Sequence, residues 1–242
     1  CTEAINIVAN GFNWNKGDKI VVAINNHHSN FVPWKMLERH GVEIGVLDID
    51  SDGNIIIDED KIKGAKVLAI THLSNVLGNK LDLKKICEIA HKNNCLVLVD
   101  AAQSVSHMKI DVKDLDCDFL TFSGHKMFGP TGVGVLYGKK NLLERLPPFQ
   151  FGGGMISSVS YEESLWTDIP EKFEAGTQNC GEVIAFAEAI NYFKLIRIEK
   201  IKKYEEELLK YALEKLSQLD KIKIYNPGKE KSISLISFNL HN

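Results

Sequence analysis

The feature that most restricts the fold of this chain is a helical segment followed at once by an unbroken apolar run. One helical face repeats at i, i+3, i+4 and i+7: Leu83, Ile86, Cys87 and Ala90. The Asn93-Asn94 pair then breaks the pattern, and residues 95–100 (CLVLVD) are apolar up to the final aspartate. Because such runs are typical of parallel sheets covered on both faces, this unit predicts an α/β fold.

The same alternation extends over most of the sequence. Strands are predicted at 19–25, 42–49, 66–72, 95–100, 119–122 and 133–138. Helices are predicted from Thr2, as N-cap, to Gly11, and at 31–41, 83–92, 181–193 and 198–219. The stretch from Pro147 to Gly176 is Gly-rich and too irregular for a regular element, which predicts a long functional loop. We expect a large domain over 1–196, then a linking helix and the truncated start of a smaller domain over 197–242.

Charge and composition exclude several classes of protein. Lys and Arg total 29 and Asp and Glu total 32, so the net charge of -3 gives no electrostatic case for a nucleic-acid or anionic-membrane partner. No apolar run approaches the roughly 20 residues that span a bilayer. The five cysteines form no C-x-x-C pair and indicate reduced thiols, not a disulfide framework or a zinc site. We therefore expect a cytoplasmic protein, or an organellar one if a targeting segment precedes residue 1.

Two local patterns give only weak evidence for a ligand or metal site. The glycines of GPTGVGVLYGKK (129–140) miss both the P-loop and the dinucleotide-binding spacings. His27 and His28 suggest a metal, but adjacent residues at an extended strand end face opposite ways, so we expect no metal site there.

Polar residues follow four of the predicted strands. Open α/β sheets bind ligands just beyond the carboxyl ends of their strands. A single polar residue in such a place is usually satisfied by a neighbouring loop, but four strands that deliver them together favour a binding site. The residues are His27, His72, Ser74, Asn75, Asp100, Gln103, Ser123, His125 and Lys126.

This set of residues suits a Schiff-base cofactor. A lysine at the sheet edge can condense with an aldehyde, and a carboxylate such as Asp100 can keep a pyridine nitrogen protonated as an electron sink. Hydroxyls and a histidine beside a helix N-terminus, where Thr2 lies, suit a phosphate. Pyridoxal phosphate needs all three features.

The motifs that carry these residues resemble a known family. VLVDAAQS (97–104) and FSGHKMFGPTGVGVLYG (122–138) resemble the class V, fold-type I pyridoxal-phosphate enzymes. The resemblance narrows to the cysteine desulfurases, most closely the SUF-type (group II) branch, through HHSNFVPW (27–34), THLSNVLG (71–78), LDCDF (115–119) and FEAGTQN (173–179). It implies a mostly parallel sheet of the seven-stranded type flanked by helices, and a small C-terminal α+β domain.

The resemblance also assigns roles around the cofactor ring. Lys126 would carry the cofactor as a Schiff base and move the substrate Cα proton. Asp100 would pair with the pyridine nitrogen, and Gln103 would bind the ring hydroxyl. His27 would stack over the ring, whereas His28 has no such role.

Further roles concern the phosphate and the substrate. Thr2, Ser123 and His125 would hold the phosphate. Thr177 would reach the phosphate of the other subunit, since members of the family are homodimers. Asn75 would help to hold the substrate carboxylate.

The implied reaction converts L-cysteine to L-alanine and leaves the sulfur as an enzyme persulfide. A sulfur-acceptor protein of a SUF-type system would then take the sulfur for iron–sulfur cluster assembly. The alternatives are a selenocysteine lyase, a catalytically incomplete partner subunit, and an α/β domain without a cofactor.

Two departures from the family qualify this reading. The family's nucleophilic cysteine and a substrate-binding arginine lie beyond the position of Asn242, so we expect a fragment that lacks both ends and turns over cysteine poorly. The local cysteines do not replace that nucleophile: Cys1, Cys87, Cys95, Cys117 and Cys180. Asn26 also stands where the SUF-type branch usually has Glu.

Overall fold

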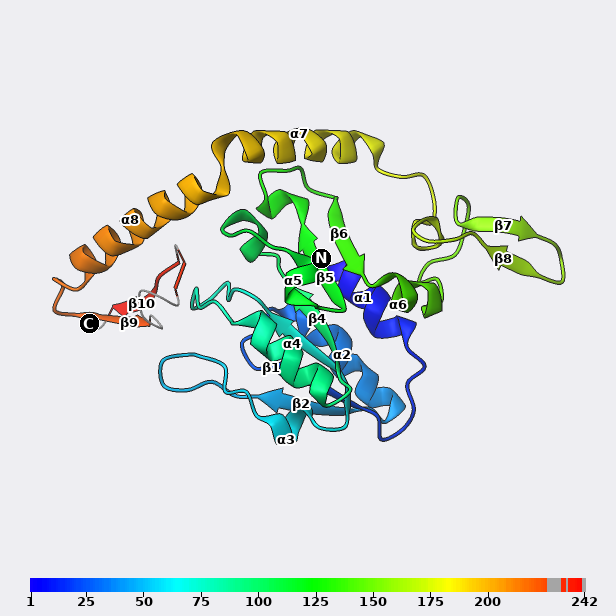
Figure 1. The fold of residues 1–242 in the computed structure, drawn as a ribbon, viewed down its shortest axis with the longest axis horizontal. Helices are drawn as coiled ribbons and strands as arrows, with labels where there is room; N and C mark the ends of the chain where they lie inside the picture. Colours follow the sequence, from blue (N-terminus) through cyan, green and yellow to red (C-terminus); the bar gives the residue numbers. More distant parts are fainter. Residues whose placement is uncertain (226–231, 234, 241–242) are drawn as a thin grey trace.

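The computed structural model describes residues 1–225, 232–233 and 235–240. A six-stranded sheet forms its centre, in the order β2-β1-β3-β4-β5-β6 (Figure 1). Neighbouring strands pair in parallel from β2 to β5, and β6 pairs antiparallel with β5. The strand bounds are β1 Lys19–Ala23, β2 Glu43–Leu47, β3 Ala65–Thr71, β4 Leu96–Asp100, β5 Phe119–Ser123 and β6 Gly134–Gly138.

The predicted mostly parallel α/β architecture is therefore confirmed, but the sheet has six strands among the described residues and not seven. The other four described strands pair with each other in two separate hairpins, β7 with β8 and β9 with β10, so none of them extends the central sheet.

Helices cover both faces of the sheet, as the continuous apolar strands predicted. Odd-numbered residues of β4, such as Val97 and Val99, pack with the buried face of α4 (Leu83–Lys92). Leu98 faces the other way and packs with α1 (Thr2–Gly11) through Ile5 and Val8. The shorter helices are α2 (Val32–Lys35), α3 (Glu59–Ile62), α5 (Val112–Leu115) and α6 (Lys140–Arg145), with 3₁₀ turns at His28–Asn30, Met36–His40, Ser104–Ser106, Gly124–Lys126 and Glu171–Phe173.

The first two predicted helices differ in detail from the observed ones. Cys1 occupies the N-cap position of α1, so Thr2 lies in the first turn and not at the cap. The predicted 31–41 helix is split into α2 and a 3₁₀ turn, and it ends where expected at Gly41, which has a φ of 78°. A left-handed residue at this position is the usual helix terminator, and glycine adopts it without strain.

The Gly-rich stretch was wrongly predicted to lack regular elements. It contains the antiparallel hairpin of β7 (Ile156–Val159) and β8 (Ser164–Trp166), which projects from the body of the molecule (Figure 1). Both strands are exposed, so the alternating burial that identifies a strand in a sequence is missing here.

Two helices lead away from the sheet to the end of the described chain (Figure 1). α7 (Cys180–Ile196) and α8 (Ile198–Leu216) meet at Arg197, whose φ of 68° turns the backbone. α8 ends three residues before the predicted Leu219. The hairpin of β9 (Ile222–Tyr225) and β10 (Ser237–Leu240) follows. Among the described residues, no helix is both long enough and apolar enough to cross a bilayer.

Candidate active site

A cavity of about 280 Å³ lies at the carboxyl ends of the strands β3, β4 and β5, beside the turn that follows β1. This is where open α/β sheets bind ligands. The volume is near the lower end for small-molecule pockets. The lining residues are Cys1, Thr2, His27, Ser29, Thr71, Leu73, Asn75, Asp100, Ala102, Gln103, Ser123, His125 and Lys126.

Asp100 is the buried charge of this cavity. It ends β4 and is 4% exposed. Its Oδ1 accepts a hydrogen bond from Ala102 N at 2.9 Å and a weak one from Cys1 Sγ at 3.5 Å. Burial raises the pKa of the Asp100 carboxyl, although the Ala102 N–H and the charge of Lys126 act in the opposite direction. A cationic ligand group beside Asp100 would offset that cost of burial.

Lys126 and His125 reach the cavity from a tight turn after β5. The residues Gly124–Lys126 form a 3₁₀ turn in which Gly124 N donates to Val133 O at 2.9 Å. A Cβ on Gly124 would lie 2.8 Å from Val133 Cγ1, so only glycine lets the two segments approach this closely. The turn thus sets an amine and an imidazole beside Ser123 at one wall of the cavity.

Another part of the cavity lining combines the turn after β1 with the start of α1. His27 Nδ1 accepts a hydrogen bond from Ser29 N at 3.2 Å and lies 3.1 Å from Ser29 Oγ. Thr2 Oγ1 donates to that same Ser29 Oγ at 2.8 Å. A chain of hydroxyls therefore joins the first turn of α1 to the His27 ring.

The histidine pair is not the extended strand end that the sequence reasoning assumed. His28 begins a 3₁₀ turn, and the two ring centroids are 5.8 Å apart and tilted by 38°. The argument that the two rings face opposite ways is therefore wrong. Among the described residues, no group of three or more His, Cys, Asp or Glu side chains is arranged to hold a metal ion.

Asn26, which departs from the family pattern, has a clear structural role. Its Nδ2 donates to Ala69 O at 2.9 Å and to Asn30 O at 3.2 Å, and its Oδ1 accepts from Thr71 N at 3.1 Å. This buried amide therefore joins the end of β3 to the His27 turn. A carboxylate at this position could not donate the first two hydrogen bonds.

The family resemblance assigns roles at the site to nine residues, and the structure brings eight of them together. Around the cavity lie Thr2, His27, Asn75, Asp100, Gln103, Ser123, His125 and Lys126. Thr177 does not line the cavity; it is exposed in the segment before α7. Its predicted role concerns another subunit and stays a prediction.

Other cavity residues were missed by the sequence reasoning. Cys1 was considered only among the cysteines that do not replace the nucleophile, and Thr71 only as part of the apolar strand 66–72. Strand alternation could have identified Thr71, because it is the register partner of Asp100 and faces the same side of the sheet.

His72 was grouped with the site residues but does not line the cavity. It is 4% exposed, and burial together with the charge of Lys80 lowers its pKa to about 4. Its Nδ1 is buried without a hydrogen-bond partner in the described part of the chain. His72 instead borders a larger, open groove of about 1290 Å³ beside α3, α4 and α5. Among the described residues, that groove is lined by lysines and carboxylates but by no Ser or Thr hydroxyl, whereas the smaller cavity combines a lysine and a buried carboxylate with several hydroxyls. The smaller cavity is therefore the candidate site.

Three of the cysteines are unsuited to nucleophilic chemistry. Burial raises the pKa of Cys87 and Cys95 to about 12 and that of Cys117 to about 11. Cys180 is exposed at the start of α7. These environments agree with the expectation that the buried three are structural.

Comparison with known proteins gives a consistent picture. The family model described as aminotransferase class-V matches residues 1–242. A probable cysteine desulfurase of Halalkalibacterium halodurans is 44% identical over 248 residues, which cover 100% of this chain and 61% of the relative. The chain thus spans about three fifths of the length of the curated relatives that it matches.

Solved structures agree in fold. The apo structure of a cysteine desulfurase from Thermococcus onnurineus has a TM-score of 0.95 and 39% identity, over 99% of this chain and 61% of that one. A cysteine desulfurase of Escherichia coli has a TM-score of 0.92 and 34% identity, over 99% and 61%. The fold predicted from the sequence is the fold of these proteins.

Proposed function

The chain belongs to the class V aminotransferase family, and from that premise we propose that it is the cofactor-binding part of a pyridoxal-phosphate-dependent cysteine desulfurase. One observation carries the proposal: Lys126, Asp100 and His125 line a single cavity at the carboxyl ends of β4 and β5. The names of the similar proteins support cysteine as the substrate.

Pyridoxal phosphate is the cofactor of this family, and the residues of the cavity fit it. The cavity offers an amine for the aldehyde, a buried carboxylate for the ring nitrogen, and hydroxyls with an imidazole for the phosphate. Bound there, the cofactor would supply an electron sink for the carbanion formed at the substrate Cα.

The residues around the ring would act on it in three ways. The Lys126 amine would hold the cofactor covalently and carry the proton to and from the substrate Cα. Asp100 would keep the ring nitrogen protonated, because an adjacent carboxylate favours the cationic form. His27 would cover the ring, and Gln103 would bind its hydroxyl.

The phosphate would be held by residues from both the turn after β5 and the start of α1. Thr2, Ser123 and His125 would donate hydrogen bonds to it, with Thr2 near the positive end of the ten-residue helix α1. Asn75 would hold the substrate carboxylate from the segment after β3.

The finer assignments are also proposals. The HHSNFVPW and SGHKMFGPTG motifs support the SUF-type branch, and thus delivery of sulfur to an acceptor protein for iron–sulfur cluster assembly in the cytoplasm. Helix α7 supports a homodimer, because Phe186 is its buried residue while Val183, Ile184, Tyr192 and Leu195 are exposed. In such a dimer Thr177 would reach the partner's phosphate.

The first test is cofactor attachment. The purified protein is incubated with pyridoxal phosphate, reduced with borohydride and mapped by peptide mass spectrometry. We expect a reduced adduct on Lys126 that is absent from Lys126→Ala. Lys140→Ala is the matched control, since the Lys140 side chain is 80% exposed and lies outside the cavity. An adduct that persists in Lys126→Ala, or its absence from the folded parent, would exclude the proposed site.

The second test addresses the reaction. The protein is supplied with L-cysteine, and alanine formation is measured with and without a thiol reductant. Alanine in amounts that depend on Lys126 supports a desulfurase. Alanine formed equally by Lys126→Ala contradicts it.

The proposed dimer through α7 is tested by light scattering, which compares the molar mass of the parent protein with that of Val183→Glu.

A further inference from the structure

Asp100 lies between two threonines in the central sheet. The β3–β4 register pairs Thr71 with Asp100, and the β4–β5 register pairs Asp100 with Thr121. Backbone hydrogen bonds continue past this level on both sides, from His72 N to Asp100 O and from Ala101 N to Thr121 O, each at 2.9 Å. The three residues therefore sit side by side on adjacent strands, which lie about 4.8 Å apart.

All three side chains point to the same face of the sheet. Residues two positions earlier on each strand, Ala69, Leu98 and Phe119, belong to one buried cluster together with α1. Because strand side chains alternate, Thr71, Asp100 and Thr121 share that face. The carboxylate is thus flanked by one hydroxyl-bearing residue on each side.

Both hydroxyls are buried and unused. Thr71 is 7% exposed and Thr121 is fully buried. Neither Oγ1 has a hydrogen-bond partner within the described part of the chain. The main chain of Thr71 is occupied, since its N–H donates to Asn26 Oδ1, so the unused capacity belongs to the side chain. A buried hydroxyl without a partner is costly, and such groups in native proteins need an explanation.

The carboxylate has capacity to accept more hydrogen bonds. Its recorded partners among the described residues, Ala102 N and Cys1 Sγ, both contact Oδ1. An ionised carboxylate has about four acceptor sites. In each threonine a single torsion, χ1, sets the direction of the hydroxyl.

We propose that Thr71 and Thr121 are positioning residues that donate hydrogen bonds to Asp100 from the two neighbouring strands, which holds the carboxylate ionised and aimed at the cofactor ring. The inference rests on the proposed function only for the identity of the group that Asp100 faces. The arrangement of the two threonines stands on the sheet register and on burial.

The expected effect is on the proton affinity of Asp100. Burial alone favours the neutral acid, and donors to the charged form oppose it. Removal of one hydroxyl donor should raise the pKa of Asp100 by about one unit, a tenfold change in its ionisation constant. Removal of both should give a larger shift than either alone.

The test measures Asp100 directly in the cofactor-free protein. Aspartate labelled with ¹³C at the carboxyl carbon is incorporated, Asp100→Asn assigns the signal, and the signal is titrated by NMR. We expect a raised pKa in Thr71→Val and Thr121→Val, which keep the shape of the side chain, and a near-parental pKa in Thr71→Ser and Thr121→Ser, which keep the hydroxyl. Thr167→Val, in the hairpin region and away from the cavity, should leave the Asp100 signal unchanged.

Each outcome decides the inference. An Asp100 pKa that is unchanged in both valine variants, or serine variants that behave like valine, overturns it and leaves the threonines as packing residues. If a valine variant does not fold, Thr→Ala and Thr→Ser at the same position give the same contrast. A parallel absorbance titration with pyridoxal phosphate separates the two hypotheses, because loss of cofactor binding in the parent refutes the proposed function and leaves the Asp100 titration readable.

Discussion

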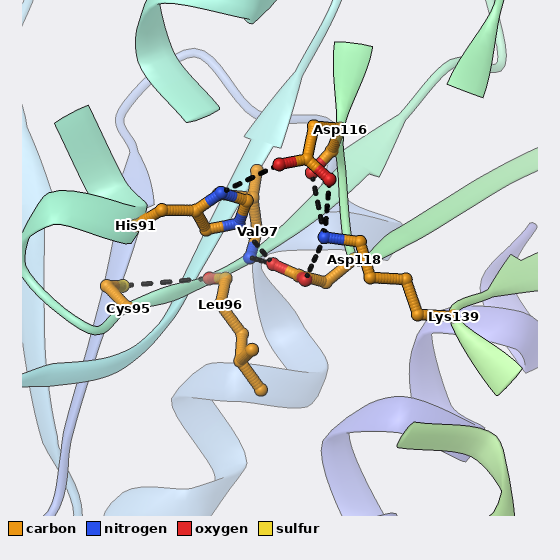
Figure 2. A network of polar contacts seen from close by, with 7 residues as sticks. All are labelled: His91, Cys95, Leu96, Val97, Asp116, Asp118 and Lys139. Atoms are coloured by element: carbon orange, nitrogen blue, oxygen red, sulfur yellow. Dashed lines mark hydrogen bonds and ion pairs between the residues drawn. The ribbon is translucent and has the colours of Figure 1, made fainter. Parts of the chain in front are cut away.

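The two ends of β4 and β5 both hold a buried aspartate, but they satisfy it in different ways. At the amino end, Asp118 is 4% exposed, and its Oδ2 accepts from Val97 N and lies 2.8 Å from His91 Nε2. Its Oδ1 is 3.0 Å from Lys139 Nζ, and Asp116 completes the group (Figure 2). At the carboxyl end, Asp100 has an amide and a distant thiol.

This difference separates a carboxylate with partners on both oxygens from one with partners on a single oxygen. A buried carboxylate with partners on both oxygens joins elements together, here α4, β4, β5 and the end of β6. A buried carboxylate beside a cavity, with free acceptor sites, favours the binding of a cation or of a hydrogen-bond donor. The following predictions test that distinction in order of decreasing effect.

Removal of the Asp118 carboxylate should be the most destabilising change. Asp118→Ala leaves the Val97 N–H and the Lys139 ammonium without a buried partner, which should cost about 3–5 kcal/mol in the free energy of unfolding. Urea unfolding followed by circular dichroism measures it. A loss below about 1 kcal/mol, as for an exposed ion pair, would mean that the network does not hold the strands together.

The buried imidazole of His72 should make stability depend on pH. Its pKa falls from 6.5 to about 4 on folding, so the folded protein resists protonation more than the unfolded chain does. Stability from this group is complete above pH 6.5 and is lost as the pH falls toward 4, by about 3 kcal/mol. We expect the difference in unfolding free energy between the parent and His72→Gln to shrink over that range. If the free energies of unfolding of the parent and of His72→Gln change in parallel from pH 7 to pH 4, burial of His72 does not lower its pKa as expected.

Asp100→Asn should stabilise the cofactor-free protein while it impairs the site. Because burial raises the pKa of Asp100, the ionised form destabilises the folded state at neutral pH, and stability from this group increases as the pH falls through the raised pKa. The neutral amide should therefore raise the free energy of unfolding, because it removes the cost of burying a charge. Thermal unfolding at pH 7 measures the gain, with the exposed Asp220→Asn as control; a loss of stability would show that Asp100 is held as a structural charge.

The features that could be predicted from the sequence are those fixed by short-range pattern. Residues 95–100 predicted a buried strand that ends in an aspartate, which lines the cavity, and the turn after β5 was located by the polar residues that follow Phe122. The β7–β8 hairpin was missed because its exposed strands carry no alternation of burial.

Long-range geometry accounts for the rest. The position of Thr121 beside Asp100 depends on the β4–β5 register, which the hydrophobic pattern of either strand alone does not specify. Likewise, the role of Asn26 depends on Ala69 and Thr71, more than 40 residues away. The predicted boundary between 196 and 197 falls where Arg197 turns the backbone, and limited proteolysis would test it as a domain boundary.

The smallest effect should come from Asp116, the exposed member of the network in Figure 2. Its carboxylate is 2.7 Å from Lys139 Nζ, but the side chain is 65% exposed. The Lys139 ammonium lowers the pKa of Asp116, so its contribution is present above pH 3.8 and is lost as the pH falls below that value. Solvent screening limits such a pair to less than about 1 kcal/mol, and Asp116→Asn should lose no more than this.

The backbone conformation of Asp116 allows three substitutions at this position to be ranked by stability. Asp116 has a φ of 53°, a left-handed conformation that Asn and Gly adopt more readily than Ala. We therefore expect urea unfolding to rank Asp116→Gly and Asp116→Asn close to the parent, and Asp116→Ala below both by about 1 kcal/mol. If Asp116→Asn instead lowered the free energy of unfolding as much as Asp118→Ala does, exposure would not explain the difference between the two aspartates. The contrast between the buried carboxylates at the two ends of β4 and β5 would then need a different physical basis.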